Sequence, residues 1–188
     1  MALTYSTPTE LMPLGSPAPD FSLSGTDGKT YSLASFDNKK ALLVIFMCNH
    51  CPYVIATQDR INKLAKEYGN KGLALVGINA NDAEKYPEDS FENMKLVANK
   101  HGYVFPYLYD ETQKVARSYD AVCTPDPYLF EKSGNQFLLR YHGRIDDSWK
   151  DERAVKERDL AKAIEAILNN KPISTDQKPA MGCSIKWK

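Results

Sequence analysis

Two continuous apolar runs lie on either side of an amphipathic segment near the centre of the chain. Residues 41–47 (ALLVIFM) and 72–79 (GLALVGIN) contain almost no polar side chains, which is typical of strands buried on both faces of a parallel sheet. Between them, residues 52–68 place apolar side chains at the spacing of an amphipathic helix, at Ile61, Leu64, Ala65 and Tyr68. The pattern predicts a β-α-β unit at the centre of an α/β domain.

Further elements are predicted around this unit. Alternating patterns with turn residues indicate two hairpins, over 20–33 and 127–143. Helical periodicity and capping residues indicate three more helices, over 87–102, 111–119 and 150–170, and a short strand is expected within 105–110. The first half of the last helix alternates in charge and is expected to be a solvated face.

The chain shows no repeat and no break in composition that would separate two domains. Its first residues, 1–13, are rich in Pro, Ser and Thr and are expected to form an arm, followed by a single domain over 14–170. The tail, 171–188, has no pattern of regular structure, but Ile185 and Trp187 are apolar side chains in a polar segment. We therefore expect the tail to dock on the domain.

Composition excludes several classes of function. Lys and Arg together number 24, as do Asp and Glu, so the chain lacks the basic excess that indicates nucleic-acid binding. The longest apolar run is much shorter than a membrane span. The opening MALTYSTPTELMPLG has neither the basic start nor the apolar block of a secretory signal. These features predict a cytoplasmic protein without membrane or nucleic-acid partners, in a compartment where thiols are kept reduced.

The candidate chemistry lies in the sequence CNHC, where Cys48 and Cys51 flank His50 at the joint between the predicted strand and helix. The first backbone N–H groups of a helix, and its dipole, stabilise a thiolate placed there. We expect Cys48 to be the exposed nucleophile and Cys51, less exposed, to resolve the mixed disulfide. His50, as an imidazolium, would further favour the Cys48 thiolate.

Two other interpretations of the cysteine pair remain open. A zinc site needs four ligands, and Cys123 and Cys183 are the residues that could complete a four-cysteine set with Cys48 and Cys51. Alternatively, the two thiols are inert and the chain is a redox-inert binding module. A lone CxxC motif at a βαβ joint in a cytosolic protein favours the redox interpretation.

The sequence resembles a known family in three places. The stretches LGSPAPDFSLSGTDGKTYSLASF, ALLVIFMCNHCPYV and VCTPDPYLF resemble the thioredoxin-fold redoxins, which include peroxiredoxins and thioredoxin-like reductases. With its CNHC site and C-terminal GCSIKW, the chain is most similar to the peroxiredoxin-like, alkyl hydroperoxide reductase–thiol-specific antioxidant type. The resemblance implies a thioredoxin fold, a mixed sheet with flanking helices, carrying an N-terminal β-hairpin and a redoxin-type insertion. It also implies that Pro125 is the cis-proline and that Thr124-Pro125 forms a substrate-side loop.

The chain departs from both main branches of that family. Met47 stands where thioredoxins carry tryptophan, and the strand before the motif lacks an acidic residue. Peroxiredoxins carry threonine three residues before the reactive cysteine. In this chain the residue three positions before Cys51 is Cys48 instead of a threonine. The resemblance therefore favours thiol-disulfide exchange, with a thiol-dependent peroxidase as the alternative enzyme.

The remaining cysteines and several polar residues are weaker candidates. Cys123 and Cys183 are predicted either to form a second redox pair or to be buried small apolar residues that never pair; a docked tail could also bring Cys183 to the CxxC motif. Asn79, Asn81 and Asp82 come at the end of a predicted strand, where ligands bind in open α/β sheets. Arg144 is a candidate positive charge facing the site, and His101 and His142 are the remaining histidines. The sequence thus predicts a thiol-disulfide oxidoreductase that needs no bound cofactor and acts on disulfide-containing proteins or small thiols.

Overall fold

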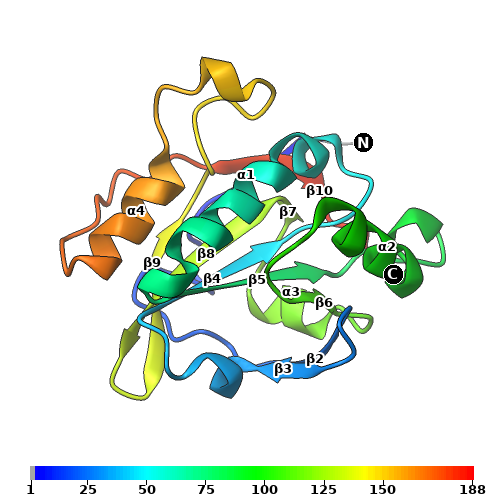
Figure 1. Cartoon of the computed structure of the whole chain (residues 1–188), viewed down its shortest axis with the longest axis horizontal. Coiled ribbons are helices and arrows are strands. Elements are labelled where there is room, and N and C mark those ends of the chain that lie inside the picture. The colour runs from blue at the N-terminus through cyan, green and yellow to red at the C-terminus, as the bar shows by residue number, and fades with distance from the viewer. Residues whose placement is uncertain (1–2) are drawn as a thin grey trace.

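The computed structural model describes residues 3–188, and within them the strands form two sheets (Figure 1). The larger sheet has the order β3-β2-β6-β5-β4-β8-β9. Its strands are β2 (Ser22–Gly25), β3 (Thr30–Ser32), β4 (Ala41–Phe46), β5 (Leu73–Asn79), β6 (Tyr107–Tyr109), β8 (Asp126–Ser133) and β9 (Gln136–His142). The smaller sheet has the order β1-β10-β7, with β1 (Leu3–Ser6), β7 (Cys123–Thr124) and β10 (Ala180–Ser184).

The central strand β4 is buried on both faces, as its unbroken apolar sequence predicted. Ala41, Leu43 and Ile45 belong to one apolar core, and the alternating residues Leu42, Val44 and Phe46 belong to the other. β4 pairs in parallel with β5 and antiparallel with β8. Because α1 (Pro52–Tyr68) connects β4 to β5, the predicted β-α-β unit is confirmed.

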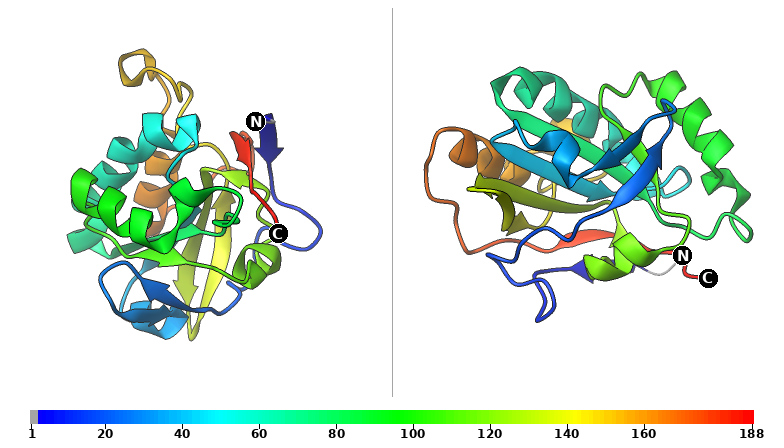
Figure 2. Two further views of the ribbon diagram at one scale, coloured as in Figure 1. Left: turned by 90° about the vertical axis from the view of Figure 1, so that its right-hand side faces the viewer. Right: turned by 90° about the horizontal axis from the view of Figure 1, so that it is seen from below.

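The helices cover both faces of the larger sheet (Figure 2). On one face lie α1, α2 (Phe91–His101) and α4 (Asp159–Leu168), and on the other lies the short helix α3 (Lys114–Ser118). None of the helices within residues 3–188 is both long and apolar enough to cross a membrane.

Three predicted helices are shorter than expected, and the one expected over 111–119 forms only as α3 (Lys114–Ser118). The helix expected over 150–170 begins only at Asp159, and the charged segment before it forms a loop with a single 3-10 turn at Glu152–Ala154. Here the polar side chains bond locally instead of continuing a helix: Asp147 accepts from the Lys156 amide and Asp151 accepts from the Arg153 amide. The helix expected over 87–102 likewise starts at Phe91, after a 3-10 turn that contains Asp89.

The two ends of the chain form strands that the sequence pattern did not indicate. β1 and β10 lie side by side (Figures 1 and 2), with Leu3 opposite Cys183 and Ser6 opposite Ala180. Neither segment alternates apolar and polar residues over a length that would mark a strand, so the pairing depends on contacts between distant parts of the chain. Residues 1–2 of the expected arm lie outside the described residues.

Candidate active site

The cysteine motif lies at the joint between β4 and α1, as the sequence predicted, but the division between the two sulfurs is different. Cys51 occupies the N-cap position of α1, directly before Pro52. Cys48 is 2% exposed and Cys51 is fully buried. The expectation that Cys48 lies at the exposed helix mouth is therefore wrong: α1 begins at Pro52, as the pattern predicted, and Cys51, not Cys48, is the residue at its N-terminus.

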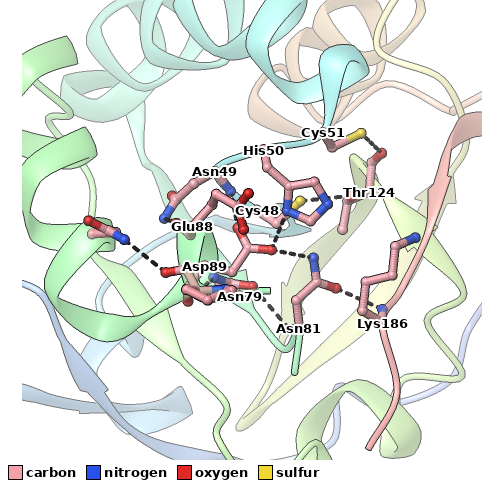
Figure 3. A network of polar contacts seen from close by, with 12 residues as sticks. Cys48, Asn49, His50, Cys51, Asn79, Asn81, Glu88, Asp89, Thr124 and Lys186 are labelled. Carbon is pink, nitrogen blue, oxygen red and sulfur yellow. Dashed lines mark hydrogen bonds and ion pairs between the residues drawn. The ribbon is translucent and has the colours of Figure 1, made fainter. Parts of the chain in front are cut away.

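Both sulfurs meet the loop at Thr124 (Figure 3). The peptide bond between Thr124 and Pro125 is cis, as the family resemblance implied. Cys48 Sγ lies 3.4 Å from Thr124 Oγ1, and Cys51 Sγ lies 3.1 Å from the Thr124 carbonyl oxygen, to which it donates a hydrogen bond when it is protonated. The fold thus brings together residues that are more than seventy positions apart in the sequence.

The electrostatics of the pair favour the negative charge on Cys51. A hydrogen bond from the Cys48 thiol lowers the pKa of Cys51 most strongly. Burial opposes this effect, while Cys183, the Val54 amide and Thr124 add to it, and the pKa falls to about 5. The same hydrogen bond, burial and the nearby Asp89 carboxylate raise the pKa of Cys48 well above its usual value. The reduced pair therefore holds a thiolate at Cys51 and a thiol at Cys48.

His50 is held by a buried carboxylate. Its Nδ1 atom lies 2.7 Å from Asp89 Oδ2, and its ring stacks on Tyr86 with centroids 5.4 Å apart. The hydrogen bond with Asp89 raises the pKa of His50, while partial burial opposes the rise. The charge of Cys51 also raises it, so the imidazolium and the Cys51 thiolate stabilise each other.

Asp89 is the central residue of the polar network in Figure 3, and the sequence analysis did not identify it. Its carboxylate accepts hydrogen bonds from the backbone N–H of Asn49 at 2.7 Å and from the side-chain Nδ2 of Asn81 at 2.7 Å. It also accepts the hydrogen bond from His50. Asn79 donates to its backbone carbonyl at 3.0 Å. The signal available in the sequence was the Asn79 and Asn81 pair after β5, since side chains at the ends of parallel strands meet near a site.

The other weak candidates have structural partners. Asp82 forms an ion pair with Lys85, and Arg144 forms one with Asp159. His101 lies 3.9 Å from Asp59. His142 is buried and its Nε2 atom lies within hydrogen-bond distance of Asp126 and Ser6, which links β9 to β8 and β1. These four residues lie outside the network that surrounds the two sulfurs.

Cys183 and Cys123 are close to the motif but are not presented to each other. Cys183 lies opposite Thr124 across the β10–β7 pair, whereas Cys123 lies opposite Ser184, so their side chains point to opposite faces of the small sheet. The Cys183 thiol donates a hydrogen bond to the Cys51 sulfur. The Cys123 thiol instead points to the carbonyl oxygen of Pro125 at 3.8 Å.

The side chains that lie close enough to share a metal ion are not the four cysteines considered from the sequence. Within residues 3–188 the group close enough is Cys48, His50 and Asp89, whose ligand atoms all lie within 4.8 Å of one another. This differs from the four-cysteine set considered from the sequence. The Asp89 carboxylate in this group already accepts three hydrogen bonds from the protein.

A family model described as Redoxin matches residues 13–164, which is most of the chain. The chain belongs to the redoxin family. Its fold is the thioredoxin fold, since the central mixed sheet and flanking helices superpose on a solved thioredoxin-family structure. As a redoxin with relatives that are oxidoreductases, it has an oxidoreductase kind of activity.

The chain is similar to proteins of several kinds. The chain is 26% identical over 125 residues to the thiol-disulfide oxidoreductase ResA of Bacillus thuringiensis, covering 66% of this chain and 68% of ResA. It is 29% identical over 105 residues to the chloroplastic peroxiredoxin Q of Triticum aestivum, covering 56% of this chain and 45% of that protein. The crystal structure of an uncharacterized conserved protein from Geobacillus kaustophilus is 44% identical, with a TM-score of 0.91, over 100% of this chain and 97% of that one.

Proposed function

We propose that this redoxin is a thiol-disulfide oxidoreductase whose Cys48 and Cys51 thiols become a disulfide when it reduces a substrate disulfide. The observation that carries the proposal is the convergence of both sulfurs on Thr124, with the pKa of Cys51 lowered to about 5 at the start of α1. A thiolate at neutral pH next to a thiol is the arrangement that disulfide exchange needs.

In this mechanism the roles are the reverse of those expected from the sequence. The Cys51 thiolate attacks one sulfur of the substrate disulfide and forms a mixed disulfide, and the other substrate sulfur leaves as a thiolate that takes a proton. Cys48 then loses its proton and attacks Cys51 Sγ, which breaks the mixed disulfide. The products are the Cys48–Cys51 disulfide and a substrate with two thiols.

Substrate access is proposed at the cavity beside the cis-proline. It has a volume of about 300 Å³ and is lined by Pro125, Tyr53 and Trp149 among other residues. The rings of Tyr53 and Trp149 are in contact, with centroids 4.2 Å apart. An aromatic wall next to the cis-proline suits the apolar part of a protein or small-thiol disulfide.

The test is the reduction of insulin disulfides with dithiothreitol as electron donor. The wild type should accelerate the reduction, Cys51→Ser should abolish the acceleration, and Cys48→Ser combined with Cys183→Ser should accumulate a mixed disulfide at Cys51. Cys123→Ser is the matched control, a buried cysteine nearby that should retain activity. Full activity in Cys51→Ser would overturn the proposal, and stoichiometric zinc in protein purified with reductant would replace it with a metal site.

A second candidate is a thiol-dependent peroxidase. It is favoured by the burial of both sulfurs, which a hydroperoxide can reach more easily than a protein disulfide, and by the similarity to peroxiredoxin Q. The Cys51 thiolate would attack one oxygen of the hydroperoxide and become a sulfenic acid, while the O–O bond breaks and the other oxygen leaves, protonated, as an alcohol or water. The Cys48 thiol would then attack Cys51 Sγ and form the same disulfide with release of water. Hydroperoxide consumption faster than insulin reduction would favour this function.

A cytoplasmic location remains a prediction that cell fractionation tests.

A further inference from the structure

The C-terminal strand occupies the backbone that was expected to receive a substrate. The family resemblance implied that Thr124-Pro125 forms a substrate-side loop. In the structure β10 pairs with β7 at this point, and Cys183 lies directly opposite Thr124. A cysteine of the chain itself thus lies beside the loop that was expected to face the substrate.

The approach between the two segments is too close for a side chain at Gly182. A Cβ atom added there would lie 2.0 Å from the Thr124 carbonyl oxygen and 3.1 Å from the Pro125 nitrogen. Glycine therefore lets β10 lie directly against the cis-proline loop, which brings the next residue, Cys183, to the sulfurs.

The chain after Cys183 is fixed by several independent contacts. The Ile185 amide donates to the Val122 carbonyl oxygen at 3.0 Å, and the Lys186 amide donates to Asn81 Oδ1 at 2.8 Å. The Trp187 ring lies under the Arg117 guanidinium, 4.4 Å from its centroid. Because Asn81 also holds Asp89, the tail and the His50–Asp89 pair share one hydrogen-bond network.

The sulfur of Cys183 lies next to the reacting pair. It lies opposite Thr124, whose carbonyl oxygen is 3.1 Å from Cys51 Sγ. Cys183 is 3% exposed and belongs to the same apolar cluster as Cys48 and Cys51, and its interaction with Cys51 lowers the pKa of Cys51. Cys51 is therefore flanked by two thiols, Cys48 from the motif and Cys183 from the tail. Either Cys48 or Cys183 can therefore become the disulfide partner of Cys51.

We propose that Cys183 is a third redox-active thiol of this site and exchanges with Cys48 as the disulfide partner of Cys51. This inference rests on the proposed thiol-disulfide function. In the oxidised protein, Cys183 loses its proton and attacks Cys51 Sγ. A Cys51–Cys183 bond forms as the Cys48–Cys51 bond breaks, and Cys48 leaves as a thiolate that takes the proton. The step neither gains nor loses electrons, and it fastens β10 to the start of α1.

The test uses the full chain oxidised with glutathione disulfide, quenched in acid, alkylated and analysed by peptide mass spectrometry. In the oxidised wild type, a fraction of chains should keep Cys48 alkylatable and contain a linked Cys51–Cys183 peptide. Cys183→Ala should lose this fraction. Cys48→Ala should also form the Cys51–Cys183 link, because Cys183 displaces glutathione from Cys51.

Two double variants separate Cys183 from its neighbour. Cys48→Ala/Cys183→Ala should stop at a glutathione adduct on Cys51, whereas Cys48→Ala/Cys123→Ala should behave like Cys48→Ala alone. Near-ultraviolet circular dichroism checks that each variant is folded, and Cys183→Ser replaces Cys183→Ala if the alanine variant is not.

The outcomes distinguish this inference from the proposed function. If the wild type forms Cys48–Cys51 and reduces insulin while Cys48→Ala keeps a glutathione adduct on Cys51, Cys183 is not a redox partner and the proposed function stands. If the wild type forms no Cys48–Cys51 disulfide and does not reduce insulin, the proposed function fails. A Cys51–Cys183 link in Cys48→Ala would in that case still support the contact between these two sulfurs.

Discussion

The Nδ1 atom of His50 lies 2.7 Å from Oδ2 of Asp89, a carboxylate that is fully buried between the CxxC motif and the loop after β5. A ligand atom of each of Cys48, His50 and Asp89 lies within 4.8 Å of the other two, so the Cys48 sulfur is close to both the imidazole and the carboxylate. Asp89 raises the pKa of Cys48 and of His50. The pair thus helps keep the proton on Cys48 and the thiolate on Cys51.

Replacing Asp89 should change both titrations at once. In Asp89→Asn the pKa of His50 should fall, because its hydrogen-bonded anion is lost, and the pKa of Cys48 should fall, because a nearby negative charge is lost. Removing a carboxylate that accepts three hydrogen bonds should also cost roughly 1–3 kcal/mol of stability. NMR titration of His50, thiolate absorbance of Cys48 and urea unfolding measure the three effects. Asp82→Asn, a buried carboxylate paired with Lys85, should leave the His50 titration unchanged.

The raised pKa of His50 makes part of the stability dependent on pH. The folded protein binds this proton more tightly than the unfolded chain, whose histidine has a pKa near 6.5. The contribution is therefore fully present below about pH 6.5 and is lost as the pH rises through the folded pKa. The difference in unfolding free energy between wild type and His50→Gln should be largest in acid and shrink towards alkaline pH. A difference that grows with pH would contradict this assignment.

The charge on Cys51 can be tested by its dependence on Cys48. Thiolate absorbance of the reduced wild type should appear as the pH rises through about 5, and Cys51→Ser should lose this transition. Cys48→Ala should raise the pKa of Cys51, because the strongest hydrogen bond to its sulfur is lost, whereas the hydroxyl of Cys48→Ser should partly restore it. A transition in acid that survives in Cys51→Ser would place the thiolate on another cysteine.

The close contact at Gly182 predicts a sharp sensitivity to one methyl group. Gly182→Ala places a Cβ atom 2.0 Å from a backbone oxygen, so β10 must move, at a cost of about 1–3 kcal/mol. The control is Gly69→Ala, where an added Cβ meets no atom within 4 Å and the backbone is helical. Urea unfolding should show a large loss for the first variant and little change or a small gain for the second. Equal stability of the two variants would refute the contact.

Much of the fold could be predicted because its signals are local. The unbroken apolar sequence of β4 and the helical spacing of Ile61, Leu64 and Tyr68 are properties of single segments, and both elements formed as expected. The strands β1 and β10 could not be predicted in this way, because each is stabilised by a partner at the other end of the chain.

The site was predictable only in part. The CxxC spacing and the helix start identified Cys48, His50 and Cys51, and the family resemblance identified Thr124-Pro125. Asp89 lies about forty residues from His50 in the sequence, and nothing in its local pattern marks it as a partner. The placement of charge was assigned to the wrong sulfur, although the predicted start of the helix was right: Cys51, directly before Pro52, is the N-cap residue of α1, and Cys48 lies three residues earlier.

The central claim is that Cys48 and Cys51 form a reversible disulfide, and a redox titration tests it most directly. The protein is equilibrated in graded glutathione buffers, alkylated with a mass-adding reagent and analysed by mass spectrometry. We expect the loss of two alkylated thiols in one two-electron transition, with a Cys48–Cys51 peptide and a potential in the range of about −270 to −180 mV found for thioredoxin-fold dithiols. Cys48 and Cys51 that both stay alkylatable across the whole range would contradict it.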